Sequence, residues 1–73
     1  MDKRIEDLTV QKVRDLMNEL HRSHKISSQL ILIDGTYTLM LKDNIQKKML
    51  LNVGNHDITK IYDELEQYIK MVL

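Results

Sequence analysis

The chain has 73 residues and a mass of 8.7 kDa, and its 11 Lys and Arg residues balance its 11 Asp and Glu residues. It contains no cysteine, which excludes a disulfide-stapled scaffold, and no apolar run approaches the ~20 residues that a membrane-spanning helix needs. A neutral chain also lacks the strong field of one sign that dedicated nucleic-acid binders and acidic DNA mimics need.

These properties predict one small α/β domain over residues 1–73. The opening MDKRIEDLTV lacks the apolar core of a signal peptide, so we expect a cytoplasmic protein. A chain this short buries only about 60% of the surface that its unfolded form exposes. Without disulfides or thiolate ligands for a metal, it needs regular packing or self-association to be stable.

The first predicted element is a helix within residues 1–25, because apolar residues recur there at helical spacing. These residues are Ile5, Leu8, Val13, Leu16, Met17 and Leu20. The start of the helix is open between two N-caps, Thr9 and Asp2.

A β-hairpin is predicted next, with strands over 29–33 and 36–42 flanking Asp34-Gly35, a pair typical of a type I′ turn. A two-residue loop places Ile33 opposite Thr36. One face then holds Leu30, Leu32, Tyr37, Leu39 and Leu41, and the other holds Ile31, Ile33, Thr36, Thr38 and Met40.

A third strand is predicted over 47–53, with Met49 opposite Leu39. This register adds Met49, Leu51 and Val53 to the first face and Lys48, Leu50 and Asn52 to the second. A second helix follows, capped by Asn55 or Asp57, with the apolar stripe Ile58, Ile61, Tyr62, Leu65, Tyr68, Ile69 and Val72. The expected fold is α+β, an α-β-β-β-α two-layer sandwich in which a three-stranded antiparallel meander carries both helices on one face.

The second sheet face is unusual, because a solvated face of an antiparallel sheet normally carries polar side chains. One interpretation is that β-propensity alone selects its aliphatic residues. The other is that a partner covers the face, with Ile31, Ile33, Met40, Lys48 and Leu50 as the binding residues. The second interpretation predicts a small non-enzymatic protein–protein interaction module, a homodimer or an adaptor or inhibitor-type accessory protein.

Other residues offer alternatives. Lys42, Lys47 and Lys48 near one end of the sheet could contact the phosphates of a nucleic acid. His21 and His24 are two possible metal ligands, fewer than a zinc site needs, and His56 lies where a helix start can hold an anion. The sequence contains no phosphate-binding glycine loop and no nucleophile with a companion base, so we expect no enzyme, no cofactor, no metal and no small-molecule substrate.

Two resemblances bear on function. Asp34-Gly35, Lys42-Asp43-Asn44-Ile45 and Asp57-Ile58-Thr59-Lys60-Ile61 resemble the two turns and the last helix start of the smaller Alu-RNA-binding subunit of the eukaryotic signal recognition particle, over about residues 28–73. That resemblance implies RNA binding through a basic concave sheet face, as half of a heterodimer. The neutral, Pro-free, Lys- and Asn-rich composition is similar to that of accessory proteins from phages and plasmids of low-GC bacteria.

Overall fold

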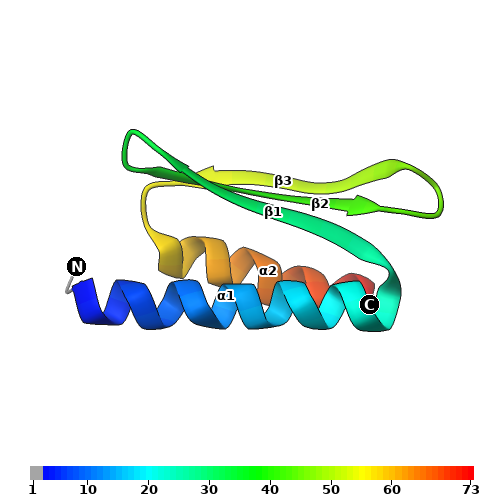
Figure 1. Ribbon diagram of the computed structural model, residues 1–73, viewed down its shortest axis with the longest axis horizontal. Coiled ribbons are helices and arrows are strands. Elements are labelled where there is room, and N and C mark those ends of the chain that lie inside the picture. The colour runs from blue at the N-terminus through cyan, green and yellow to red at the C-terminus, as the bar shows by residue number, and fades with distance from the viewer. Residues whose placement is uncertain (1–2) are drawn as a thin grey trace.

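The computed structural model describes residues 3–73 and has the predicted α-β-β-β-α order. Its elements are α1 (Lys3–His24), β1 (Ile26–Ile33), β2 (Thr36–Asp43), β3 (Lys48–Asn55) and α2 (Ile58–Val72). The strands form one antiparallel sheet in the order β1-β2-β3. Both helices lie against the same face of this sheet, so the predicted α+β two-layer sandwich is confirmed (Figure 1).

The two helices run side by side in the same direction beneath the sheet (Figure 1). α1 packs against β1, whereas α2 packs against β3 and β2. None of the described elements covers the other face of the sheet, which we call the outer face. The molecule is elongated along the helices, with extents of 38 × 20 × 18 Å.

The core lies between the helices and the inner face of the sheet, and every member of it is apolar or aromatic. Its buried residues are Val13, Leu20, Ile26, Tyr37, Leu39, Leu41, Ile58, Ile61 and Leu65. The alternate residues of β2 alone supply three of them, as a strand with one covered face requires.

The start of α1 differs from one of the two predicted alternatives. Thr9 lies inside the helix and its hydroxyl donates a hydrogen bond to the Ile5 carbonyl, 2.8 Å away, so it is not the N-cap. The alternative cap, Asp2, lies outside the described residues. Ile5 and Leu8 are exposed because the first turns of α1 extend beyond the start of α2, so this part of the predicted apolar stripe lies outside the core (Figure 1).

The β1–β2 hairpin has the predicted register, with Ile33 opposite Thr36 and Leu30 opposite Leu39. Asp34 and Gly35 both have positive φ, 51° and 75°, as a type I′ turn requires. This local turn therefore fixes which residues of β1 and β2 share a face, and Ile31 and Ile33 lie on the outer face, as predicted.

The predicted register of β3 is wrong by four positions, because Leu39 lies opposite Val53 rather than Met49. An even shift leaves Leu51 and Val53 on the inner face. A β-bulge then interrupts the ladder between Leu41 and Lys42, so that Lys42 lies opposite Met49 and Leu50 is the extra residue of β3. Because of the bulge, Lys48 and Met49 lie on the opposite faces of the sheet from those predicted.

The β2–β3 turn explains why these two strands stay paired closer to the turn than the predicted register allowed. One Asp43 carboxylate oxygen accepts hydrogen bonds from the backbone N–H groups of Ile45, at 2.8 Å, and Gln46, at 3.1 Å. Lys47 adopts a positive φ of 57°. Because the Asp43 side chain satisfies the turn amides, four residues complete the turn and both strands continue to the Asp43–Lys48 pair.

The start of α2 matches one of the two predicted alternatives, with Asp57 as the N-cap. The Asp57 carboxylate accepts hydrogen bonds from the backbone N–H of Thr59, at 3.0 Å, and from its hydroxyl, at 2.6 Å. These hydrogen bonds hold the pKa of Asp57 below its usual range. The other candidate cap, Asn55, accepts a hydrogen bond from the Asp57 backbone N–H and shapes the approach to the helix.

A polar contact joins the helix layer to the sheet. The hydroxyl of Tyr37, a buried residue of β2, donates a hydrogen bond of 2.7 Å to the Glu6 carboxylate of α1. This hydrogen bond, together with burial, raises the pKa of Tyr37 to about 12. It ties the N-terminal part of α1 to the central strand.

Replacing Tyr37 with phenylalanine removes this hydrogen bond and leaves the Glu6 carboxylate without its tyrosine donor. We expect Y37F to lower the free energy of unfolding by about 1–2 kcal/mol, measured by urea denaturation. The control is Tyr68→Phe, which removes a hydroxyl from α2 and should change stability less. Equal stability of Y37F and the wild type would show that the hydrogen bond does not stabilise the fold.

The same contact predicts a loss of stability at alkaline pH. Because folding raises the pKa of Tyr37 above its unfolded value near 10, the folded state holds the proton more tightly than the unfolded state does. This stabilisation is complete below about pH 10 and is lost as the pH rises toward about 12. In urea titrations over this range, the wild type should lose more stability than Y37F. Parallel pH profiles would contradict the prediction.

Candidate functional site

The outer face is a sheet surface that none of the described elements covers. Its members follow from the strand register, since residues opposite one another share a face. They are Ser27, Gln29, Ile31 and Ile33 of β1, Thr36, Thr38, Met40 and Lys42 of β2, and Met49, Asn52 and Gly54 of β3.

The outer face carries little charge. Lys42 is the one charged side chain among these members, although 30% of the residues in the chain are charged. The other polar members are hydroxyl and amide side chains, which both donate and accept hydrogen bonds without a formal charge. The centre of a protein–protein interface is depleted of charge in the same way.

Aliphatic side chains occupy the rest of the outer face. Ile31 and Met40 are half-buried by their neighbours, whereas Ile33 is 64% exposed and Met49 is 51% exposed. Met40, Lys42 and Met49 border a shallow depression of about 350 Å³ together with Gln29 and the two serines at the start of β1. The face thus offers a low-charge surface with a hollow between two flexible methionines.

Two of the five predicted binding residues do not lie on the outer face. Leu50 packs against the buried core, because the bulge turns it toward the helices beside Leu51. Lys48 pairs with Asp43, on the same side of the ladder as Leu41, and is therefore not an outer-face residue. Met49, predicted to lie in the core, takes their place on the outer face.

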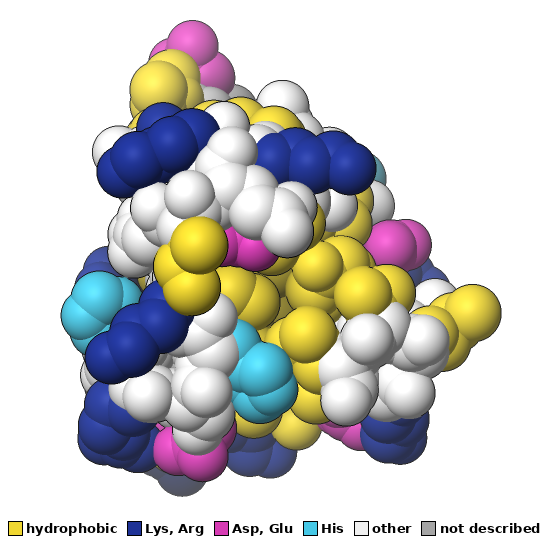
Figure 2. All heavy atoms as spheres, turned by 90° about the vertical axis from the view of Figure 1, so that its right-hand side faces the viewer, with side chains coloured by type: hydrophobic (Ala, Val, Ile, Leu, Met, Phe, Trp, Pro, Cys, Tyr) yellow, Lys and Arg dark blue, Asp and Glu magenta, His cyan; other side chains and the backbone are white. Residues whose placement is uncertain are grey.

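The three lysines of the predicted nucleic-acid surface lie together at one end of the sheet. Lys42, Lys47 and Lys48 are all exposed, in and next to the β2–β3 turn. Lys25 lies next to the same turn, because the backbone N–H of Asn44 donates a 3.2 Å hydrogen bond to the Lys25 carbonyl. Figure 2 shows this end of the molecule, with basic side chains spread around a hollow where apolar side chains and a histidine reach the surface.

The three histidines are exposed and lie next to helix ends. His21 and His24 lie exposed in the last turn of α1, and residues 3–73 contain no cluster of three or more His, Cys, Asp or Glu side chains that could hold a metal ion. His56 is exposed before α2, where the Asp57 carboxylate already accepts from the Thr59 amide. The predicted capping role of this region is the one that the structure shows.

Comparisons with protein-family models, with characterised proteins and with solved structures find no match for this chain. The resemblance to the Alu-RNA-binding subunits therefore stays a prediction. Neither of the two described helices is long and apolar enough to cross a membrane.

Sequence reasoning missed Met49 as an outer-face residue, and the reason is specific. A bulge depends on how two strands and the helices beneath them pack, and nothing in Lys48-Met49-Leu50-Leu51 marks the extra residue. Alternation alone fits Met49 or Leu50 equally well to either face. The Asp43-Asn44 pair was the available signal for the turn, because an aspartate can accept hydrogen bonds from the amides that follow it.

Proposed function

We propose that this chain is a cytoplasmic, non-enzymatic interaction module that binds a second copy of itself through the outer face. The observation that carries the proposal is an uncovered sheet face with four aliphatic side chains and one charge. Each large aliphatic side chain left in water forgoes roughly 1.5–3 kcal/mol of burial energy. In so small a domain, covering this face is a substantial source of stability.

A second copy fits this face electrostatically. Two sheets stack face to face with their strands nearly aligned, about 30° apart. A two-fold axis that lies between the two sheets and runs across the strands over Thr38 puts the Lys42 residues of the two copies at opposite ends of the interface. The two Lys42 charges are then kept apart, and the hydroxyl and amide side chains of one copy can form hydrogen bonds with those of the other.

The alternative mode of self-association, in which the β1 strands of two copies pair edge to edge, is disfavoured by the helix layer. Two helices need about 20 Å of width, whereas three strands span only about 10–14 Å. Since α1 packs beneath β1, edge pairing would bring two copies of α1 closer than the ~8–10 Å that packed helices require. The outer face has no such obstruction.

The size of the outer face limits how tightly two copies can bind. Three strands of eight residues cover about 14 × 27 Å, or roughly 400 Å² per copy. Stable interfaces bury about 800 Å² per partner, and smaller ones are typically transient. We therefore expect a weak, reversible dimer with a dissociation constant in the micromolar range or above.

Sedimentation velocity over a wide range of protein concentrations tests the proposal. The wild type should show a sedimentation coefficient that rises with concentration. Ile33→Lys and Met40→Glu should each remain monomeric, because each buries an unpaired charge in the dimer. Leu8→Lys is the matched control, since it changes an exposed leucine on α1, in the helix layer, and should dimerise like the wild type. A wild type that is monomeric at every concentration, or variants that dimerise unchanged, would contradict the proposal.

Nucleic-acid binding is a second candidate function, which the gathering of Lys25 with Lys42, Lys47 and Lys48 favours. If three of these lysines contact phosphates, the logarithm of the binding constant should fall with the logarithm of salt concentration at a slope of about −2 on single strands.

The test is a salt titration with labelled single-stranded RNA and DNA. Replacing Lys42, Lys47 and Lys48 with glutamine should remove the salt dependence, whereas Lys12→Gln on α1 should leave it in place. Binding that does not change with salt, or that the triple variant retains, would rule out these lysines as the phosphate contacts.

A further inference from the structure

A cleft separate from the outer face runs between α2 and the free edge of β3. It consists of two hollows, of about 430 Å³ and about 220 Å³, that share Glu64. β3 forms one wall, from Leu51 to Asn55, and α2 forms the other. We call this feature the β3–α2 cleft.

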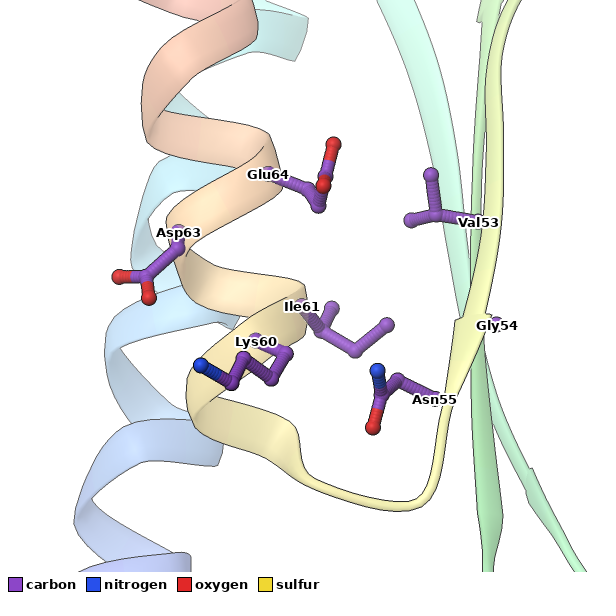
Figure 3. A pocket seen from close by; sticks show the side chains of 7 residues that line it. All are labelled: Val53, Gly54, Asn55, Lys60, Ile61, Asp63 and Glu64. Atoms are coloured by element: carbon purple, nitrogen blue, oxygen red, sulfur yellow. The ribbon is translucent and has the colours of Figure 1, made fainter.

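Figure 3 shows the larger hollow and the direction of its side chains. Val53 and Asn55 extend from β3 toward α2, and Ile61 and Glu64 extend from α2 toward β3. Asp63 points away from the cleft. The Asn55 oxygen accepts a hydrogen bond from the Asp57 N–H at 2.9 Å, which turns the Asn55 amide nitrogen into the cleft. The hollow is therefore mixed in character, because the Asn55 amide and the Glu64 carboxylate face each other's strand or helix across it beside Val53 and Ile61. Lys60 also lines the hollow, with its amino group directed away from β3.

The Glu64 carboxylate has no partner within residues 3–73, where it makes neither a hydrogen bond nor an ion pair. The neighbouring acid on the same helix, Glu66, is instead paired with Lys70 at 3.2 Å. An unpaired carboxylate where the two hollows of the cleft meet attracts a cationic side chain and repels an acidic one.

The second hollow continues the cleft with more apolar walls. Leu51, Tyr68, Met71 and Val72 line it, and Met71 is 82% exposed. Beside these side chains runs the free edge of β3, which pairs with β2 on its other side only. Every second residue of an edge strand directs its backbone N–H and C=O groups outward, where an added strand can bind them. The bulge lies before Leu51, so the edge along the cleft is regular.

We propose that the β3–α2 cleft binds an extended peptide segment, which adds to the edge of β3 as a fourth strand and places a lysine or arginine against Glu64. Successive side chains on one face of such a strand lie about 7 Å apart. Apolar residues two positions before and after the cation therefore reach the two hollows. The partner is a strand-forming segment with one basic residue between two apolar ones.

A second copy of this chain does not fit the cleft. Antiparallel pairing of two β3 strands would bring two Glu64 carboxylates toward one interface, and like charges there are unfavourable. It would also bring two copies of α2 too close together, because α2 packs beneath β3 as α1 packs beneath β1. An isolated peptide carries no helix layer and has neither obstruction.

The experiment uses the complete chain and a fluorescein-labelled heptapeptide, Thr-Val-Thr-Lys-Thr-Val-Thr, whose valines and lysine share one face when extended. Fluorescence polarisation should show saturable binding, at least tenfold tighter than for the same peptide with glutamate in place of lysine. Glu64→Lys should reverse this preference. Asp63→Lys is the matched control, because it makes the same charge change one residue away on a side chain that points elsewhere.

Amide chemical shifts should locate the bound lysine peptide along Leu51–Asn55 and the facing side of α2. Equal binding of the lysine and glutamate peptides, an unchanged preference in Glu64→Lys, or no saturation up to about 1 mM protein would overturn the proposal. The outcome is independent of self-association: Ile33→Lys should still bind the peptide, and Glu64→Lys should still show the sedimentation behaviour of the wild type.

Discussion

The structure depends on the burial of one face of β2 beneath two helices. Leu39 and Leu41 have no exposed surface, and they meet fully buried side chains from α1 and α2, such as Val13 and Ile61. With no disulfide and no metal cluster among the described residues, this single apolar layer holds the elements together. Truncating one such core side chain typically costs about 2–5 kcal/mol, a large part of the 5–15 kcal/mol that stabilises a domain.

Placing both helices on one face creates the surfaces available for function. The helix layer is wider than the three strands, so it obstructs the addition of another copy at either edge while leaving the outer face open. The outer face has one charge and flexible methionines, whereas the cleft beside β3 has an unpaired carboxylate. These surfaces differ in chemistry, which is why we propose a different partner for each.

Much of the fold could be predicted because the deciding interactions are local. Asp34-Gly35 sets the β1–β2 register through its positive φ angles, and Asp57 starts α2 through hydrogen bonds to Thr59 two residues away. The register of β3 could not be predicted in the same way. It combines a local Asp43-stabilised turn with a bulge, and the bulge depends on how the strands and the helices beneath them pack.

The amino-acid sequence by itself determined the order of the elements, their antiparallel connection and the outward facing of Ile31, Ile33 and Met40, since each follows from periodicity or from a turn of a few residues. Only the tertiary structure decided that Leu50 packs against the core, that Met49 lies on the outer face and that Glu64 lies unpaired in a cleft. These outcomes depend on contacts between segments far apart in the chain, and alternation within one strand or one helix carries no information about such contacts.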